Sequence, residues 1–508
     1  MRQVQNNQKQ IGEILIPDVK ISLTSRDEIP KILIGLQQMY KNSVVRKKIF
    51  KILEDSIPKK INVNTGRPGM YLWAILVLGV IRLSCNWDYD KLLEIANNHK
   101  ILRQILGHGI RMNSFETDDE TQYHLSTLKD NLPLLTTDIL DHINQVVVNA
   151  GLEILGVYEA NIKGRCDSFV VETDVHFPTD INLALDAIRS AIRLIASICS
   201  ALGIQEWRQS SYNIRQIKKL FRLLQKLRRS KSKKQDKKEA KEKLIKEKHL
   251  DYIDLLYTHV HRIVLTIKKI REMGIVDEKL ELELVKVEQY IEDVKRQNDQ
   301  ILRRVINDET IPHEEKVFSI FERHTEWINK GKVGITAELG LRVCVLEEQH
   351  GFILHHMVME KQTDDKVAIP MVEETKRRFP NLTSCSFDKG FYTPENRTKL
   401  GGIIEGVILP KKGKVSGKDL DIERSEDFIK EKNQHAAVES AINALENHGL
   451  DRCPDHGIEG FKRYVALAIV GRNIQILGHI VQQKQLKDER RRLKLKKTWD
   501  AKRNQISA

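Results

Sequence analysis

Three acidic residues stand where a folded chain could gather carboxylates. Asp174 ends the alternating run "SFVVETD", Asp388 ends the short run "SCSFD", and Glu439 lies in "HAAVESAIN", which has helical spacing. Three carboxylates at one place repel each other unless a cation neutralises them. Oxygen ligands without clustered His or Cys favour Mg²⁺ or Mn²⁺. Since two such ions support phosphoryl transfer, we expect Asp174, Asp388 and Glu439 to hold two metal ions.

The elements around these acids predict an α/β fold. Alternating runs predict strands, and periodic runs between them predict helices. The order is one strand, a helical block, two strands, and then helices alternating with two further strands. This order is that of a ribonuclease H-like mixed sheet, in which the first and fourth strands are neighbours. Asp174 and Asp388 are therefore expected side by side, with Glu439 presented by the last helix. The expected strands are 166–174, 338–348, 351–361, 384–388 and 406–410, and the helices are 369–380, 393–401 and 435–449.

The chain of 508 residues is long enough for several domains. We expect a helical N-terminal domain that binds DNA ends or dimerises, a ribonuclease H-like catalytic domain, a helical basic insertion within it, and a basic tail. Their predicted bounds are 1–155 for the first, 156–204 and 335–480 for the second, 205–334 for the insertion and 481–508 for the tail.

Two helical features are expected within these regions. Apolar residues three and four apart form two seams on either side of Gly274, which predicts two helices. They either pair as an antiparallel hairpin within the chain or serve dimerisation between chains. Asn298 lies in the second seam and either fixes its register or is an exposed polar spot. A further helix is expected at 132–153, closed by Gly151.

The net charge of +14 is concentrated in two segments. Residues 215–250 contain 16 Lys or Arg and 4 Asp or Glu, and residues 484–503 contain 10 and 3. Such patches attract polyanions such as nucleic acid or an anionic membrane, although solvated helix faces give the same pattern. Within the first segment we expect phosphate contacts from four residues: Lys226, Arg228, Arg229 and Lys231.

Other features limit the class of protein. The six Cys include no CxxC pair, which argues against a zinc ribbon or a disulfide framework and predicts reduced, mostly buried thiols. The apolar run at 71–81 is shorter than the ~20 residues that a membrane span needs, so it predicts a buried helix. The N-terminus has no apolar signal core, which predicts a cytoplasmic protein.

Three blocks of the sequence resemble the catalytic blocks of bacterial insertion-sequence DDE transposases, most closely the ISNCY type. They are "ETDVHFPTDINLALDAIR", "DKGFYTPENR" and "HAAVESAINALENHGLDRCPDHGIEGFKRY", and the resemblance spans roughly 40–485. It implies cleavage at transposon ends and strand transfer into target DNA, with the family's catalytic acids falling on Asp174, Asp388 and Glu439. Many related transposases have Lys or Arg seven residues after the Glu, whereas Glu446 stands here.

The resemblance also implies partners and leaves alternatives open. It implies double-stranded DNA (terminal inverted repeats and target), a homodimer or higher oligomer on DNA, a nucleoid location and no membrane. Lys389 and Arg397 are expected at the surface or on the DNA backbone. His176 and His435 flank the acids and either contact DNA, tune the site, or pack and cap. The alternatives are a ribonuclease H-like nuclease or resolvase without strand transfer, and a non-catalytic DNA-binding descendant.

Overall fold

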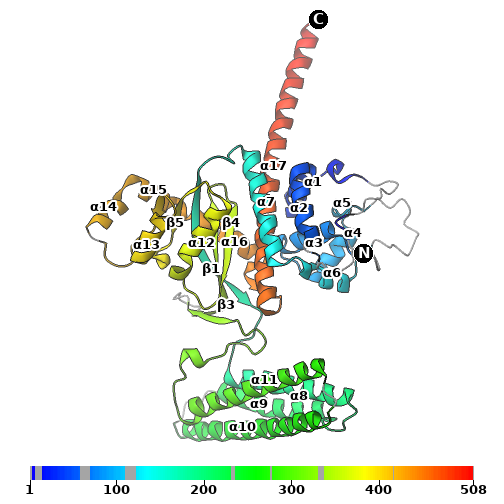
Figure 1. Ribbon diagram of the computed structural model, residues 1–508, viewed down its shortest axis with the longest axis vertical. Helices are drawn as coiled ribbons and strands as arrows, with labels where there is room; N and C mark the ends of the chain where they lie inside the picture. Colours follow the sequence, from blue (N-terminus) through cyan, green and yellow to red (C-terminus); the bar gives the residue numbers. More distant parts are fainter. Residues whose placement is uncertain are drawn as a thin grey trace. The chain divides into compact units, whose positions relative to one another are not determined.

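The computed structural model describes residues 3–5, 14–55, 57, 69–108, 122–229, 235–274, 277–329, 337–415 and 417–506. The chain forms an α/β fold with two compact units (Figure 1). One unit combines Met1–Asp174 with Ile328–Ala508, and the other is Val175–Trp327. The chain therefore leaves the first unit directly after Asp174 and returns to it about 150 residues later.

A seven-stranded mixed sheet lies at the centre of the first unit. Its order is β2-β3-β1-β5-β6, with β4 paired to β3 and β7 paired to β1. β3 is antiparallel to both β1 and β4, whereas β5 is parallel to β1 and to β6. The predicted hairpin is thus confirmed as β3 and β4. The strands are β1 (Ile162–Thr173), β2 (Glu326–Asn329), β3 (Ala337–Glu348), β4 (Ile353–Met359), β5 (Leu382–Phe387), β6 (Gly406–Ile408) and β7 (Arg452–Cys453).

Helices alternate with the later strands. The helix expected at 369–380 begins earlier, at Asp364. Thr393 caps the next helix, α13, as predicted, because its hydroxyl accepts a hydrogen bond from the amide of Asn396. The single helix expected at 435–449 is instead α15 and α16, followed by a π-helical turn in which Gly449 has φ of +101°. These helices are α12 (Asp364–Arg378), α13 (Pro394–Gly401), α14 (Lys418–Arg424), α15 (Glu426–His435) and α16 (Ala437–Leu445).

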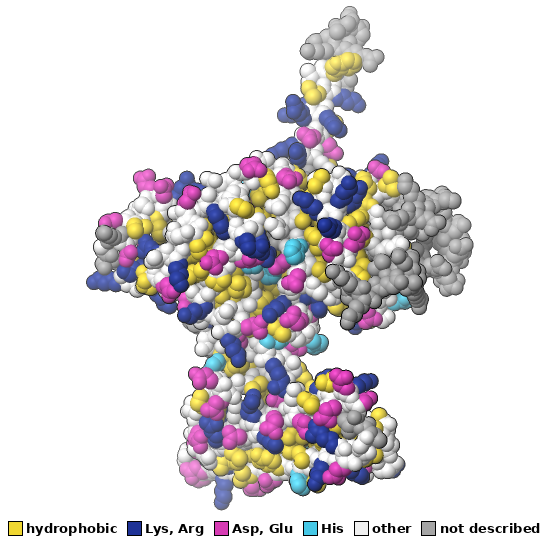
Figure 2. Space-filling model, viewed as in Figure 1, with side chains coloured by type: hydrophobic (Ala, Val, Ile, Leu, Met, Phe, Trp, Pro, Cys, Tyr) yellow, Lys and Arg dark blue, Asp and Glu magenta, His cyan; other side chains and the backbone are white. Residues whose placement is uncertain are grey.

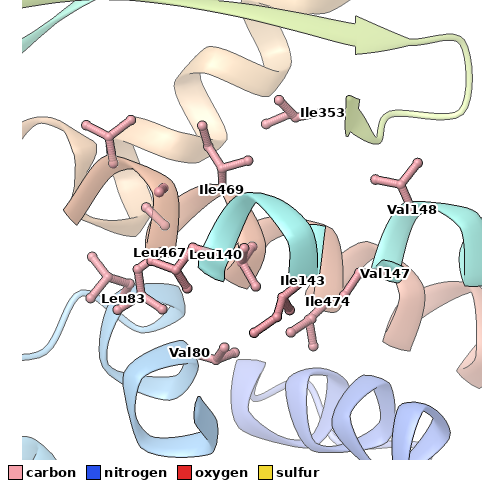
Figure 3. Close-up of a cluster of buried hydrophobic side chains, with 14 of the residues drawn as sticks. Val80, Leu83, Leu140, Ile143, Val147, Val148, Ile353, Leu467, Ile469 and Ile474 are labelled. Atoms are coloured by element: carbon pink, nitrogen blue, oxygen red, sulfur yellow. The ribbon is translucent and has the colours of Figure 1, made fainter. Parts of the chain in front are cut away.

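The N-terminal helices share one hydrophobic core with the sheet instead of forming a separate domain. The C-terminal helix α17 (Gly457–Ile506) runs beside α7 and also packs against α1 and α3 (Figure 1). Figure 3 shows the meeting point, where Val80, Ile143 and Ile474 come from three different helices. The helices are α1 (Glu28–Lys41), α2 (Ser43–Asp55), α3 (Leu72–Ser84), α4 (Tyr89–Asn98), α5 (Lys100–Ile105), α6 (Leu125–Asn131) and α7 (Thr137–Leu155).

The end of α7 differs from the prediction, and the burial of α3 agrees with it. α7 continues through Gly151, where an added Cβ would lie 2.2 Å from the Phe352 ring, and ends at Gly156 with φ of +74°. Gly151 is therefore required for close packing, and Gly156 supplies the left-handed cap. The run predicted as a buried helix is α3, every residue of which is buried.

One described helix, α17, contains an 18-residue window apolar enough to cross a membrane, with a mean hydropathy of 1.4. However, 72% of that window is buried inside the fold. The apolar half of α17 therefore packs as a core helix.

The second unit is a bundle of helices with its own hydrophobic core. The chain position of the insertion, after the first strand, is as predicted, but it begins at Val175 and includes the helix at 180–201 that the sequence assigned to the catalytic domain. That helix belongs here because Ile188, Ile192 and Ile195 are fully buried in the bundle core. The bundle consists of α8 (Asp180–Ala201), α9 (Ser210–Arg229), α10 (Gln235–Glu272) and α11 (Glu278–Ile301).

The predicted helical hairpin is confirmed as α10 and α11, with Gly274 at φ of +68° between them. Two ion pairs show that the helices are antiparallel. Arg271 pairs with Glu288 (2.7 Å) near the turn, and Lys246 pairs with Asp308 (2.8 Å) farther from it. α11 nevertheless packs most extensively against α8. Asn298 is fully buried, so it is not an exposed polar spot.

Candidate active site

Asp388 lies beside Asp167 and not beside Asp174. The parallel register of β1 and β5 pairs Cys166 with Phe387, so the next residue on each strand is an Asp. Asp174 is seven residues farther along β1, roughly 23 Å at about 3.3 Å per residue. The expected juxtaposition of Asp174 with Asp388 is therefore wrong.

The error has a simple physical cause. β1 begins at Ile162, four residues before the predicted start, and β5 is aligned with its first residues. β5 therefore ends halfway along β1. The far end of β1 pairs instead with β7, and there Asp174 has an exposed side chain (61%) with Oδ1 3.8 Å from the Arg452 guanidinium.

Glu439 reaches Asp167 because α15 and α16 follow the same face of β1. The side chains of Lys163, Arg165 and Asp167 are two residues apart and therefore lie on one face of the strand. Nζ of Lys163 lies 2.5 Å from the carboxylate of Glu431. Two residues of β1 span about 6.6 Å, and four residues of a helix span about 6 Å. Every second residue on this face of β1 therefore lies opposite every fourth residue of the α15–α16 segment. His435 then lies near Arg165, and Glu439 lies near Asp167.

A fourth carboxylate, Asp364, begins α12 and contacts β1 through Ser168, whose side chain points to the opposite face from Asp167, and its charge still raises the pKa of Asp167. Its Oδ1 accepts a hydrogen bond from the Ser168 hydroxyl at 2.6 Å. On its other side, a Cβ added to Gly390 would lie 3.0 Å from its Oδ2. Asp364 thus bridges the middle of β1 and the loop that follows Asp388. The sequence prediction missed both Asp364 and Asp167.

The electrostatics of Asp167 reflect this crowding. Burial is the largest cause that raises its pKa, to about 6, and the charges of Asp388, Asp364 and Glu439 raise it further against the opposing hydrogen bond from the Ser168 amide. That bond joins the Ser168 nitrogen to Oδ1 of Asp167 at 2.7 Å. A carboxyl with such a pKa is held among other anions in a partly desolvated position, which is typical of functional sites.

His435 also belongs to this site. Its Nδ1 lies 3.0 Å from the hydroxyl of Ser386, which is level with Arg165 on the neighbouring strand. Burial lowers the pKa of His435, while the nearby Asp388 and Glu439 act in the opposite direction. The histidine is therefore a half-buried group beside the acids, as its position in the sequence predicted.

His176 lies in the other unit. Its Nε2 is 2.5 Å from Oδ2 of Asp186, which also accepts a hydrogen bond from Arg189. The hydrogen bond to Asp186 raises the pKa of His176. This contact is a local tie between the start of the insertion and α8.

The remaining predicted contacts divide into free and paired groups. Lys389 is exposed directly after Asp388. Arg397 is paired with Asp419 at 2.8 Å, so it is less available to DNA than expected. Lys226, Arg228 and Arg229 are all exposed on α9. Partial burial nevertheless lowers the pKa of Arg228, and the charge of Asp180 on α8 opposes that shift. Lys231 lies outside the described residues.

The distinctive "DRCPDHG" block connects the sheet to the helical core. Arg452 and Cys453 form β7 beside the end of β1. Asp455 then pairs with Arg82 of α3 at 3.2 Å and with Arg463 of α17 at 3.1 Å. The Arg82 side chain is 5% exposed, so Asp455 anchors this block to the helical core. The block thereby positions the far end of β1, and its carboxylate is paired with arginines away from the acidic site.

The acids share one electrostatic environment without forming a coordination sphere. Within the described residues, no three His, Cys, Asp or Glu side chains converge closely enough to hold a metal ion. Asp388 and Glu439 are both exposed, however, and exposed side chains change rotamer readily. The donor set consists of carboxylates, which is the chemistry that suits Mg²⁺ or Mn²⁺.

Comparison of the chain with protein-family models, with curated proteins and with solved structures finds no match in any of the three. The arguments for function therefore rest on the residues and their geometry.

Proposed function

We propose that this protein is a DDE transposase in which Asp167, Asp388 and Glu439 form the catalytic triad. The observation that carries the proposal is that Asp388 and Glu439 lie within electrostatic range of Asp167 at the middle of β1, where burial and then their charges raise the pKa of Asp167. The sequence resemblance supplies the class of reaction, namely phosphodiester cleavage at transposon ends and strand transfer. The first acid moves from Asp174 to Asp167.

The strand arrangement supports the same class of fold. The order β4-β3-β1-β5-β6, with β3 antiparallel and β5 parallel to β1, is the order expected of a ribonuclease H-like sheet. In such a sheet the central strand carries the first acid and its parallel neighbour carries the second. Asp167 and Asp388 occupy those two places.

Each residue has a definable role in this proposal. Asp167 and Asp388 would hold two Mg²⁺ or Mn²⁺ ions between neighbouring strands, and Glu439 would complete the ligand set from α16. When bound, the ions supply Lewis-acid activation of water or a 3′-OH and stabilise the leaving oxygen. The Ser168 amide would orient Asp167 by donating a hydrogen bond to it, and Asp364 would fix Ser168 by accepting from its hydroxyl. His435 would border the site as a neutral group at pH 7.

The experiment is metal-dependent cleavage of DNA that carries the sequences flanking the coding region. The full-length protein should nick or cut this DNA with Mg²⁺, and EDTA should abolish the reaction. Glu439→Gln should reduce the rate at least about 100-fold, since loss of one transition-state contact commonly costs that much. Glu446→Gln, two helical turns away, is the matched control and should cleave normally.

Two results would contradict this proposal. Cleavage that persists in Glu439→Gln would exclude that residue from the triad. Cleavage without strand-transfer products would favour the alternative, a ribonuclease H-like nuclease.

A further inference from the structure

Helix α9 concentrates the positive charge of the insertion. Over Ser210–Arg229 it carries seven Lys or Arg residues and no Asp or Glu. The start of α10 is different, because between 235 and 250 its six Lys residues are interleaved with four acids. The basic segment predicted at 215–250 therefore contains two different surfaces, of which α9 has the uncompensated charge.

Five of the seven basic residues of α9 follow a single face. Ile214, Ile217 and Leu224 are buried in the core of the bundle. On the exposed side, five basic residues step by four, three, four and three positions, which keeps them on one stripe of a helix. The stripe is about 21 Å long, at about 1.5 Å per residue. We call it the α9 stripe, and its members are Arg215, Lys219, Arg222, Lys226 and Arg229.

The α9 stripe lacks acidic partners. None of its five side chains is paired with a described carboxylate. Elsewhere in the bundle, basic side chains are paired, as Arg271 is with Glu281 and Glu288, and Lys295 is with Glu292. A row of like charges costs folding free energy through repulsion, and a polyanion relieves that repulsion.

The surface at the end of the stripe is hollowed. Arg222, Gln225, Lys226 and Arg229 line an open depression of about 460 Å³. Three cationic groups and one amide there offer donors and no carboxylate, which is the donor set that phosphate oxygens accept.

We propose that the α9 stripe binds the phosphate backbone of double-stranded DNA. A length of about 21 Å of duplex carries about 12 phosphates, at one per about 1.7 Å of axis, so the row of cations has matching charges to meet. A membrane surface fits less well, because the apolar face of α9 is already buried in the bundle. The choice of DNA as the polyanion rests on the proposed function, but binding does not require the acidic site.

The test measures DNA binding by the full-length protein in EDTA, where cleavage cannot occur. Anisotropy of a labelled duplex of arbitrary sequence is titrated at several salt concentrations. Replacing Arg222, Lys226 and Arg229 together with Gln should flatten the slope of log K against log salt by about 2.7, since each phosphate contact contributes about 0.9. Affinity at moderate salt should fall tenfold or more.

The matched control removes the same charge from α10. Lys237, Lys238 and Lys243 are exposed but interleaved with acids, and their replacement by Gln should change the slope by less than about 0.5. Circular dichroism and the melting temperature should be unchanged in both variants, because exposed charges contribute little to stability.

Three results would overturn the inference. The first is an unchanged slope in the stripe variant together with a large loss on deletion of residues 484–508. This segment includes the basic end of α17, on which Figure 2 shows Lys and Arg side chains. The second is an equal loss in stripe and control variants. The third is loss of binding to phosphatidylserine vesicles with normal DNA binding. A stripe variant that binds poorly but still cleaves at saturating protein would leave the proposed function intact.

Discussion

Two points on the same strand carry an Asp, yet they differ in what surrounds them. At Asp167, β5 ends on one side, α16 passes over and α12 begins, so three further carboxylates gather. At Asp174 the chain leaves for the insertion, and within the described part of the chain its charged partner is exposed Arg452, which also pairs with Glu172. An acid at the end of a strand is exposed to solvent. An acid beside the end of a neighbouring strand can also lie near other carboxylates, and a metal site needs several of them.

The largest expected effect separates these two acids by activity. Asp167→Asn should lower metal-dependent cleavage by at least about 1000-fold, as expected when one member of a cooperating catalytic set is lost. Asp174→Asn should change the rate by less than about threefold, because its side chain is remote from Asp388. Rates of DNA cleavage under single-turnover conditions measure both. Equal losses of cleavage rate in the two variants would contradict the claim that only Asp167 belongs to the active site.

The next effect concerns stability and pH. The pKa of Asp167 is raised from 3.8 to about 6 in the folded chain, so as pH rises from 4 to 6 the unfolded state loses its proton first. The free energy of unfolding should therefore fall over this range, by at most about 3 kcal/mol at about 1.4 kcal/mol per pKa unit. Asp167→Asn removes this loss, so without metal it should be more stable than the wild type at pH 8.

Denaturant unfolding at pH 4, 6 and 8 in EDTA measures this difference. Asp174→Asn is the control and should follow the wild type at each pH. A destabilised Asp167→Asn at pH 8 would mean that burial and the neighbouring carboxylates do not disfavour the charged form of Asp167.

A smaller effect is expected at Asp364. Asp364→Asn keeps an oxygen for the Ser168 hydroxyl but removes a charge, and groups that orient metal ligands typically contribute 10- to 100-fold. The cleavage rate should fall within about that range. Asp365→Asn, one residue along α12, should cleave normally, and a normal rate for Asp364→Asn would place Asp364 outside the site.

The smallest effect is expected at the other end of the strand. Arg452→Gln breaks contacts to Glu172 and Asp174, but the Arg452 side chain is 55% exposed. Exposed ion pairs typically contribute about 0–1 kcal/mol. The melting temperature should fall by no more than a few degrees. A larger fall would show that this end of β1 depends on the pair.

The sequence predicts the elements of this fold better than their pairing. Heptad spacing found the α10–α11 hairpin, and alternation found β3, β4 and β5, because these patterns are local. The first four residues of β1, 162–165, were missed because Lys163 and Arg165 place charges on one face, so this segment does not have the pattern of an apolar strand. Lys163 is paired with Glu431 of α15, about 270 residues away, and Arg165 is paired with Glu347 of β3.

The candidate site was found in part for the same reason. Asp388 was predicted from a strand end and Glu439 from a helix, and the charges of both act on Asp167. The first acid depended on the register of β1 against β5, which no local pattern encodes. An Asp inside an otherwise buried strand is a usable signal, since strands rarely bury a carboxylate without a partner. Similarly, the membership of α8 in the insertion depends on its packing against α11.

The most direct test of the central claim is Mn²⁺ binding at pH 8, followed by electron paramagnetic resonance of the free ion with full-length protein. The wild type and Asp174→Asn should bind Mn²⁺ with the same affinity, whereas Asp167→Asn should bind at least about tenfold more weakly, since it loses one charged ligand. Wild-type affinity in Asp167→Asn together with weak binding in Asp174→Asn would contradict the account and return the first acid to the end of the strand.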